Sequence, residues 1–332
     1  MSRFRSLWTA IVLGGTCAAP QPAHAFIEGM VVSCPMNGEI WGSPAMQASV
    51  AELADLGVEW IQIHPYARIR TDGTVEFHDP RTRESLRRGL AYIRKGGLQT
   101  FLKPHLAYWG AFSWRGAIRF ASDAEWARFF DGYQRWIVAH AELAQEFGVP
   151  ALSIGTELDA TLDHADEWRA IIAAVRAVYD GHITYAANWD RVTRVPFWDA
   201  VDAIGVQAYF PVGPADAARD VIVEGWRAPL AVLGGRAKGL DKPVVFTEVG
   251  YALSRDAPRE PWVPKVDRSA EASEVRARLT EVILNEMPKH DFIAGVFFWK
   301  WIPGRTWFQN DFSMRDPAMR SLIAHAWSER RP

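Results

Sequence analysis

Short apolar runs alternate with longer amphipathic runs along this sequence, and the alternation predicts an α/β fold, a single (β/α)8 TIM barrel. A second observation concerns the ends of two apolar runs. Ala151–Glu157 and Val244–Glu248 both finish in Thr-Glu, which puts a carboxylate at the tip of a buried strand. An unpaired charge is costly to bury, so these two acids indicate a functional site rather than core filling.

The predicted strands are runs rich in β-branched and aromatic residues that stop at a polar residue or a turn. Val244–Glu248 is typical, because Pro243 precedes it and Gly250 closes it. The predicted strands are Ile27–Ser33, Glu59–His64, Gln99–His105, Ala151–Glu157, Ile183–Asn188, Ala203–Tyr209, Val244–Glu248 and Ala294–Trp299.

The predicted helices lie between the strands, and several carry capping signals such as Ser122 at a start and Gly148 at an end. The fifth unit is short, with room for little more than one helical turn around Phe197–Val201. Ser254–Asp267 reads as a long loop after the seventh strand. The predicted helices are Pro44–Leu56, Arg83–Lys95, Asp123–Phe147, Asp166–Tyr179, Trp226–Lys238, Ala270–Glu286 and Pro317–Ser328.

A doubly wound open sheet is the alternative fold, but no Gly-rich phosphate loop follows the first strand. The N-terminus reads as a secretion signal, with Arg3 and Arg5 before an apolar run too short to span a bilayer. We therefore expect a signal peptide over 1–25, a barrel domain over 26–332, and a periplasmic or secreted protein. Cys34 would be the one cysteine left after cleavage, which excludes an internal disulfide.

The charge pattern excludes several classes of partner. A net charge of −2 without a basic run argues against nucleic acid or an anionic membrane. The nine histidines are scattered singly, so we expect no metal and no cofactor. We expect a monomer whose partner is an oligo- or polysaccharide, because 16 tryptophans offer flat rings that suit sugar faces. About half of these tryptophans are expected in the core.

Polar or aromatic residues follow seven of the eight apolar runs, where a (β/α)8 barrel builds its active site. They are His64, His105, Glu157, Asn188, Tyr209, Glu248 and Trp299. Trp299 and Trp301 have period-two spacing and are expected to face one side of a strand, with one of them stacking under a sugar.

Glycosidic cleavage needs two carboxyl groups in different protonation states. Glu157 ends the fourth strand and Glu248 the seventh, so both can lean across the barrel mouth. We assign Glu248 as nucleophile and Glu157 as acid/base, with burial and like-charge repulsion holding a proton on Glu157. A separation of about 5–5.5 Å would mean that configuration is retained. Either acid alone could instead be a salt-bridged residue of the barrel rim.

Seven motifs together resemble glycoside hydrolase family 113, a family of β-1,4-mannanases, over about Met30–Trp327. The motifs are Leu102-Lys-Pro-His105, Trp114-Arg-Gly116, Gly155-Thr-Glu-Leu158, Tyr185-Ala-Ala-Asn-Trp-Asp190, Gln207-Ala-Tyr-Phe-Pro211, Phe246-Thr-Glu-Val-Gly-Tyr251 and Phe297-Phe-Trp-Lys-Trp301. The resemblance implies a retaining barrel glycosidase with Glu157 as acid/base and Glu248 as nucleophile.

The resemblance also implies which residues bind substrate. Those expected to line the subsite of the cleaved sugar are Asn188, Asp190, Tyr209 and Trp299; the shared motifs add His105, Trp114, Arg115 and Trp301. Two positions depart from the wider pattern. Thr156 stands where most of the wider clan has Asn before the acid/base, and Gln207 stands where Asp is expected in many relatives.

Two other functions remain open at this point. One is a non-catalytic glycan-binding barrel that serves polysaccharide export or sensing, which the presence of both acids argues against. The other is a metal-dependent barrel hydrolase, which would need a His-x-His pair or a comparable ligand cluster. The sugar, its linkage, and endo or exo action stay undetermined by the sequence.

Overall fold

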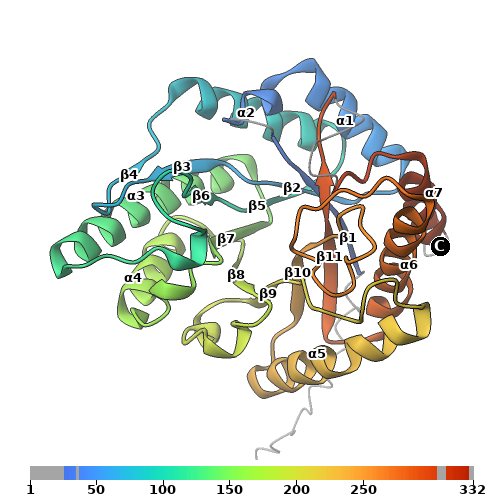
Figure 1. Ribbon diagram of the computed structural model, residues 1–332. Helices are drawn as coiled ribbons and strands as arrows, with labels where there is room; N and C mark the ends of the chain where they lie inside the picture. The colour runs from blue at the N-terminus through green and yellow to red at the C-terminus, as the bar shows by residue number, and fades with distance from the viewer. Residues whose placement is uncertain (1–25, 35–36, 305–311, 329–332) are drawn as a thin grey trace, which may run out of the picture.

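Eight parallel strands close into a barrel in this computed structural model, which describes residues 26–34, 37–304 and 312–328. The strand order is β1-β11-β10-β9-β8-β7-β5-β2. The predicted barrel is confirmed, and Figure 1 shows its strands at the centre with the helices around them. The barrel strands are β1 (Ile27–Val32), β2 (Trp60–Ile63), β5 (Gln99–Leu102), β7 (Ala151–Thr156), β8 (His182–Asn188), β9 (Ala203–Gln207), β10 (Val244–Val249) and β11 (Ile293–Trp301).

The helices that surround the barrel begin and end where local chemistry favours it. The Ser122 side chain accepts from the backbone N–H of Glu125 and the Glu125 side chain returns to the Ser122 N–H, which closes a capping box on α3. Gly148 ends the same helix at a φ of 63°. The helices are α1 (Pro44–Asp55), α2 (Pro80–Lys95), α3 (Asp123–Phe147), α4 (Ala165–Arg176), α5 (Arg219–Leu240), α6 (Ala270–Glu286) and α7 (Pro317–Ser328).

Two helix starts differ from the prediction by more than one residue. α2 begins three residues before Arg83, because Asp79 caps it by accepting from the N–H of Arg81. α5 begins seven residues before Trp226, since Ile222 extends the buried stripe by one turn. The short fifth unit is confirmed: β8 and β9 are joined by two 3₁₀ turns. The 3₁₀ turns are η1 (Glu39–Gly42), η2 (Arg115–Ala117), η3 (Asp159–Thr161), η4 (Val192–Arg194), η5 (Trp198–Ala200) and η6 (Met287–Lys289).

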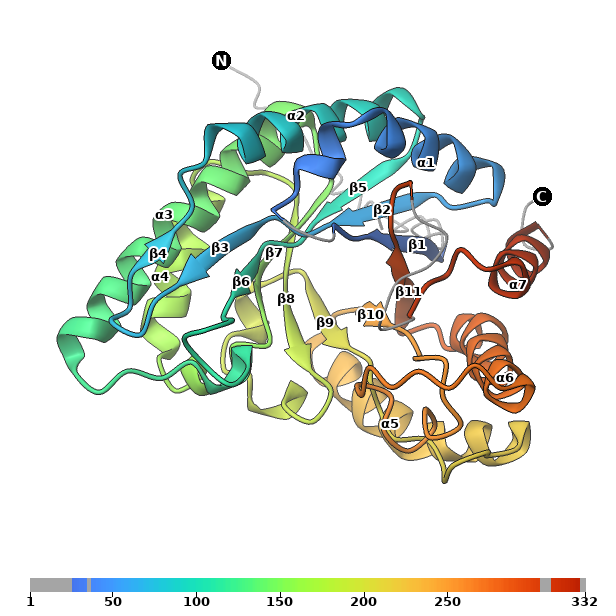
Figure 2. The same ribbon diagram turned by 45° about the horizontal axis from the view of Figure 1, so that its top comes forward.

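A small second sheet, which the sequence did not predict, extends from the barrel mouth (Figure 2). It contains β3 (Tyr66–Ile69), β4 (Val75–Glu76) and β6 (His105–Ala107). The predicted strand over 99–105 is in fact two strands, β5 and β6. Pro104 separates them because it lacks an N–H for the ladder. The predicted loop over 254–267 is confirmed as free of helix and strand.

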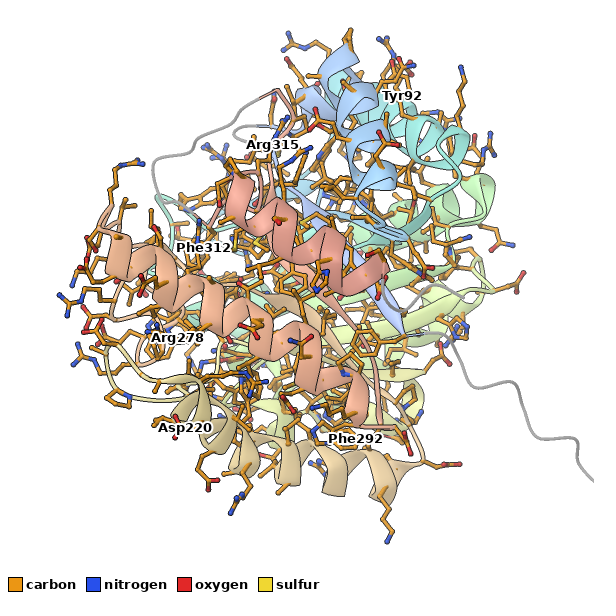
Figure 3. The ribbon with its side chains drawn as sticks, turned by 90° about the vertical axis from the view of Figure 1, so that its right-hand side faces the viewer. Tyr92, Asp220, Arg278, Phe292, Phe312 and Arg315 are labelled. Atoms are coloured by element: carbon orange, nitrogen blue, oxygen red, sulfur yellow. The ribbon has the colours of Figure 1, made fainter. Side chains whose placement is uncertain are left out.

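The core has an inner and an outer layer. Val31, Phe101 and Phe297 form a small cluster in the barrel interior, while a much larger cluster fills the space between strands and helices. Of the tryptophans that the structure describes, seven are buried: Trp41, Trp136, Trp168, Trp198, Trp226, Trp301 and Trp327. Figure 3 shows α6 and α7 side by side. Trp327 of α7 packs on Phe298 of β11, which fixes this pair of helices against the strand.

Candidate active site

A cavity of about 1380 Å³ opens at the C-terminal ends of the barrel strands. Most of the residues predicted for the site line this cavity: His105, Trp114, Arg115, Glu157, Asn188, Asp190, Tyr209, Glu248 and Trp299. The strands bring together side chains that are far apart in the sequence, because the carboxyl ends of parallel strands share one face of the barrel. The cavity is therefore the candidate active site.

Of the residues predicted to bind substrate, Trp301 lies outside this cavity; His64, a predicted strand-end residue, is fully buried and does not line it either. The side chain of Trp301 is fully buried, and the guanidinium groups of Arg315 and Arg320 lie 4.7 and 5.5 Å from its ring centroid. The reason is a bulge: from Met30 to Val32, β1 advances two residues while β11 advances three, from Phe298 to Trp301. The extra residue breaks the period-two alternation, so Trp299 faces the cavity and Trp301 faces the outer core.

Glu248, on β10, meets a hydrogen-bond donor at each carboxylate oxygen. Lys103 Nζ lies 2.6 Å from Oε1, and the Tyr209 hydroxyl donates to Oε2 at 2.9 Å. Just after β10, Gly250 allows the chain to pass close to β11, because a Cβ at position 250 would lie 2.4 Å from the carbonyl oxygen of Trp299. Two donors, one of them cationic, hold this buried side chain in one orientation.

Lys103 is fully buried inside the barrel, and its ammonium group donates three hydrogen bonds. Besides Glu248, it donates to Gln207 Oε1 at 2.8 Å and to the carbonyl of Thr247 at 3.3 Å. The Thr247 hydroxyl donates to the same Gln207 oxygen at 2.8 Å. Burial lowers the pKa of Lys103, and the negative charge of Glu248 opposes that shift. Gln207 thus orients the ammonium group toward Glu248.

Glu157 follows directly after β7 in a left-handed backbone conformation, with a φ of 53°. Such a conformation costs a non-glycine residue about 1–2 kcal/mol. The backbone N–H of Glu157 donates to the carbonyl of Ala186 at 2.9 Å and holds the turn in place. The residue two positions earlier is Gly155, where a Cβ would lie only 2.8 Å from the rings of Trp168 and Tyr185. The turn directs the carboxyl group of Glu157 into the cavity, where the side chain is 19% exposed.

Arg115 links the two acids. Its Nη1 lies 2.8 Å from Glu157 Oε2, and its Nη2 lies 3.4 Å from His105 Nδ1. His105 Nε2 in turn lies 3.7 Å from Glu248 Oε1. Burial lowers the pKa of His105 well below its ordinary value, and the neighbouring cations Arg115 and Lys103 add to this effect. A neutral histidine therefore lies between the two carboxyl groups.

Opposing influences act on the proton of Glu157. Burial raises its pKa, and the cation of Arg115 opposes that shift. The negative charge of Glu248 raises the pKa further, while Lys103 opposes it. Burial and the charge of Glu248 therefore favour the protonated form of Glu157, while the cations of Arg115 and Lys103 favour its ionised form.

Aromatic rings form two walls of the cavity. On one side, Trp109 lies 5.5 Å from Tyr66 between ring centroids and is 59% exposed. On the other side, Trp262 stacks on Trp189 at 5.7 Å with an angle of 16° between planes, and is 47% exposed. Trp299 lines the cavity between these walls. Exposed indole faces at a cavity are suited to pack on sugar rings.

Several residues of this site escaped the sequence analysis. Lys103 lies within a motif that was noted, and a lysine inside an apolar strand is the signal that could have identified it. Lys300 also lines the cavity, and burial lowers its pKa to about 8. Trp109 and Trp262 lie on loops, where the sequence gives no periodicity that would assign them to one cavity.

The described part of the chain contains no cluster of His, Cys, Asp or Glu side chains arranged to hold a metal ion. Among the same residues, no helix is both long and apolar enough to cross a membrane.

The chain resembles known proteins in both sequence and fold. The model of Glycoside Hydrolase Family 113 matches residues 34–314. No curated protein matches the chain. A GH113 β-1,4-mannanase complex is similar in structure, with a TM-score of 0.81 and 21% identity over 92% of this chain and 99% of that chain. The GH113 β-mannanase AaManA from Alicyclobacillus acidocaldarius, in complex with ManMIm, has a TM-score of 0.77 and a sequence identity of 28%. The match covers 92% of this chain and 97% of that chain.

A more distant structure shares the fold alone. The glycoside hydrolase family 5 mannosidase from Rhizomucor miehei gives a TM-score of 0.57 with 13% identity, over 91% of this chain and 92% of that chain.

Proposed function

The chain belongs to glycoside hydrolase family 113, and on that premise we propose that it cleaves β-1,4-linked mannan or a related β-glycan by double displacement, with retention of configuration. It is a β-mannanase-like glycoside hydrolase; its substrate and the roles of Glu157 and Glu248 are the proposal. Glu248 is the nucleophile and Glu157 the acid/base.

One observation carries the assignment of roles: the same residue type occupies two different environments in one cavity. Glu248 receives a donor at each oxygen, which suits a group that must attack as an anion. Burial raises the pKa of Glu157, which suits a group that must give a proton near neutral pH.

The proposed reaction has two steps. In the first, a carboxylate oxygen of Glu248 forms a bond to the anomeric carbon as the glycosidic bond breaks, and Glu157 protonates the departing oxygen. In the second, Glu157 takes a proton from a water molecule, whose oxygen bonds to the anomeric carbon and releases Glu248. Lys103 and Tyr209 hold the carboxylate of Glu248 in one orientation before and after attack.

The walls of the cavity support an oligosaccharide or polysaccharide as substrate. A volume of about 1380 Å³ exceeds what one sugar ring needs, and exposed indole rings line the same cavity as the two acids. Two of the similar structures are described as mannanases, which favours β-1,4-mannan as the first polymer to test.

Hydrolysis of mannohexaose, followed by proton NMR of the first product, tests this function. We expect the first reducing sugar to have the β configuration, and Glu248→Ala to be inactive. The exposed residue Glu142 provides a matched control, since Glu142→Ala should retain full activity. An inverted product, or full activity of Glu248→Ala, would rule out the mechanism. Tight oligosaccharide binding without turnover, measured by calorimetry, would favour the non-catalytic glycan-binding role.

We also propose that the protein is exported and that cleavage occurs near Phe26. The support is the sequence pattern of residues 1–25, which lie outside the described part of the chain. N-terminal sequencing of the mature protein from a bacterial host should begin near Phe26, and an intact Met1 would contradict export by this signal.

A further inference from the structure

The end of β7, which carries Glu157 into the cavity, contains a bulge. Along β8 the paired positions advance two residues, from Thr184 to Ala186, while β7 advances three, from Ser153 to Thr156. Glu157 follows directly and has a left-handed backbone, with a φ of 53°. Bulges beside active sites redirect a side chain, and a non-glycine residue keeps a strained conformation only where its surroundings fix it. The direction of Glu157 therefore depends on contacts with neighbouring segments.

Two consecutive backbone N–H groups of this turn are held by β8. The N–H of Glu157 donates to the carbonyl of Ala186 at 2.9 Å. The N–H of Leu158 donates to the hydroxyl oxygen of Tyr185 at 2.8 Å. Leu158 is 1% exposed and Tyr185 is fully buried, so this side-chain oxygen satisfies an N–H that would be costly to leave unpaired. The hydroxyl of Tyr185 thus replaces the ladder partner that Leu158 lacks.

The ring of Tyr185 packs against the bulge itself. A Cβ at Gly155 would lie 2.8 Å from this ring, so ring and strand are in direct contact. Trp168 and Phe197 pack edge to face on the same ring, each with its centroid 5.4 Å away. Close packing on these sides leaves the ring little freedom to move. The hydroxyl is therefore held in one place beside Leu158.

The carbonyl of Leu158 is held from within the turn. Thr161, in η3, donates to it from its hydroxyl at 2.7 Å and from its backbone N–H at 3.0 Å. The indole N–H of Trp168 donates to the Thr161 hydroxyl oxygen at 3.1 Å and orients that hydroxyl. Both backbone polar groups of Leu158, the residue after Glu157, thus end on buried side chains.

We propose that Tyr185 is a positioning residue whose hydroxyl fixes Leu158 and thereby directs the carboxyl group of Glu157. The hydroxyl of Thr161 completes this hold on Leu158. The inference rests on the proposed role of Glu157 as acid/base. In the cavity, Arg115 contacts one carboxylate oxygen of Glu157 at 2.8 Å, but that contact does not fix the backbone that carries the side chain. The contacts of Leu158 leave the carboxyl group free to give and take its proton.

Tyr185→Phe tests the proposal, because it removes the hydroxyl and keeps the ring. A misplaced acid slows the bond cleavage that needs a proton and spares the cleavage that does not. We expect kcat/KM on mannohexaose to fall about tenfold, while kcat/KM on a 2,4-dinitrophenyl β-mannoside stays within about twofold. Tyr179→Phe is the matched control: its buried hydroxyl donates to the carbonyl of Val149 at 2.7 Å, before β7 begins. This control should leave both values unchanged.

The outcomes separate this inference from the proposed function. Equal losses on the two substrates in Tyr185→Phe, or no loss on mannohexaose, would overturn the positioning role. Glu157→Ala provides the reference. Full activity of Glu157→Ala on mannohexaose would overturn the assignment of the acid, and this inference with it. A selective loss in Glu157→Ala without one in Tyr185→Phe would overturn the inference alone.

Should Tyr185→Phe fail to fold, Thr161→Val decides. It removes the hydroxyl that donates to the carbonyl of Leu158 and keeps the shape and the backbone N–H contact. We expect the same selective loss on mannohexaose, smaller at about threefold, because one donor to that carbonyl remains. Equal changes of kcat/KM on the two substrates would overturn the inference.

Discussion

The two carboxyl groups of the cavity are the same residue type in contrasting surroundings. Glu248 lies inside the barrel with Lys103 at 2.6 Å on one oxygen and Tyr209 at 2.9 Å on the other. Glu157 lies nearer the cavity mouth, in a left-handed turn, with Arg115 at 2.8 Å on one oxygen. The contrast shows that strand ends place both carboxyl groups in one cavity, while different neighbouring segments give each group its own partners.

The contrast also has a structural cost. A fully buried lysine and a buried glutamate lose their hydration, and their pairing offsets that loss only while both are present. Glu157 keeps some exposure and avoids part of this cost. The surroundings of Glu248 should therefore be the more sensitive to truncation, and those of Glu157 the more sensitive to pH.

The largest expected effect comes from removing each acid in turn. Glu248→Ala should lower kcat on mannohexaose by on the order of 10⁵-fold, because no covalent intermediate can form. Glu157→Ala should lose ~10²–10⁴-fold, the usual contribution of general acid catalysis. Assays with a 2,4-dinitrophenyl β-mannoside, whose leaving group needs no proton, should spare the first step in Glu157→Ala alone. Equal losses on this substrate would contradict the division of roles.

Lys103→Met addresses the buried pair. It leaves Glu248 buried without its cation, so the free energy of unfolding should fall by about 3–5 kcal/mol. Urea unfolding at pH 7 measures this loss. The double variant Lys103→Met/Glu248→Gln removes both charges and should recover most of it. A single variant as stable as the unmodified protein would mean that the pair does not stabilise the barrel interior.

Arg115→Met changes the acid side. The cation favours the ionised form of Glu157, so its removal should raise the pKa of Glu157 and move the alkaline limb of kcat/KM up by about one pH unit. The pH profile on mannohexaose measures this shift, and Arg119→Met at an exposed position is the control. Movement of the limb toward lower pH would contradict the stated balance of charges.

Trp262→Ala should have the smallest effect. Loss of the exposed ring removes a stacking surface worth about 0.5–1.5 kcal/mol, so KM for mannohexaose should rise about two- to tenfold. The rate on a 2,4-dinitrophenyl β-mannoside should stay the same, since that substrate presents a single sugar ring at the site of cleavage. Val232→Ala, an exposed position on α5, is the control. An unchanged KM would remove Trp262 from the binding surface.

The barrel and both acids could be predicted because each depends on local pattern. Apolar runs that end in a polar residue define a strand and its tip, and the C-terminal tips of parallel strands share one face. This placed Glu157 and Glu248 at one cavity, although 91 positions separate them. The ends of α3, α6 and α7 were also predictable, since capping residues and apolar periodicity depend only on residues that are close in the sequence.

The rest depends on contacts between distant segments. Lys103 pairs with Glu248, which is 145 positions away, and no pattern in the strand around Lys103 identifies this partner. Trp301 faces the outer core because β11 gains a residue against β1, which period-two reasoning on one strand cannot detect. The small sheet of β3, β4 and β6 pairs segments of two to four residues, too short for a periodic signal.

The central claim is that Glu248 forms a covalent bond to the sugar. A 2-deoxy-2-fluoro-β-mannosyl fluoride slows the second step, so the intermediate should accumulate and be found by mass spectrometry of a protein digest. The account predicts one label, on the peptide that contains Glu248, and no label in Glu248→Ala. A label on Glu157, or an unlabelled protein that hydrolyses mannohexaose with inversion, would contradict it.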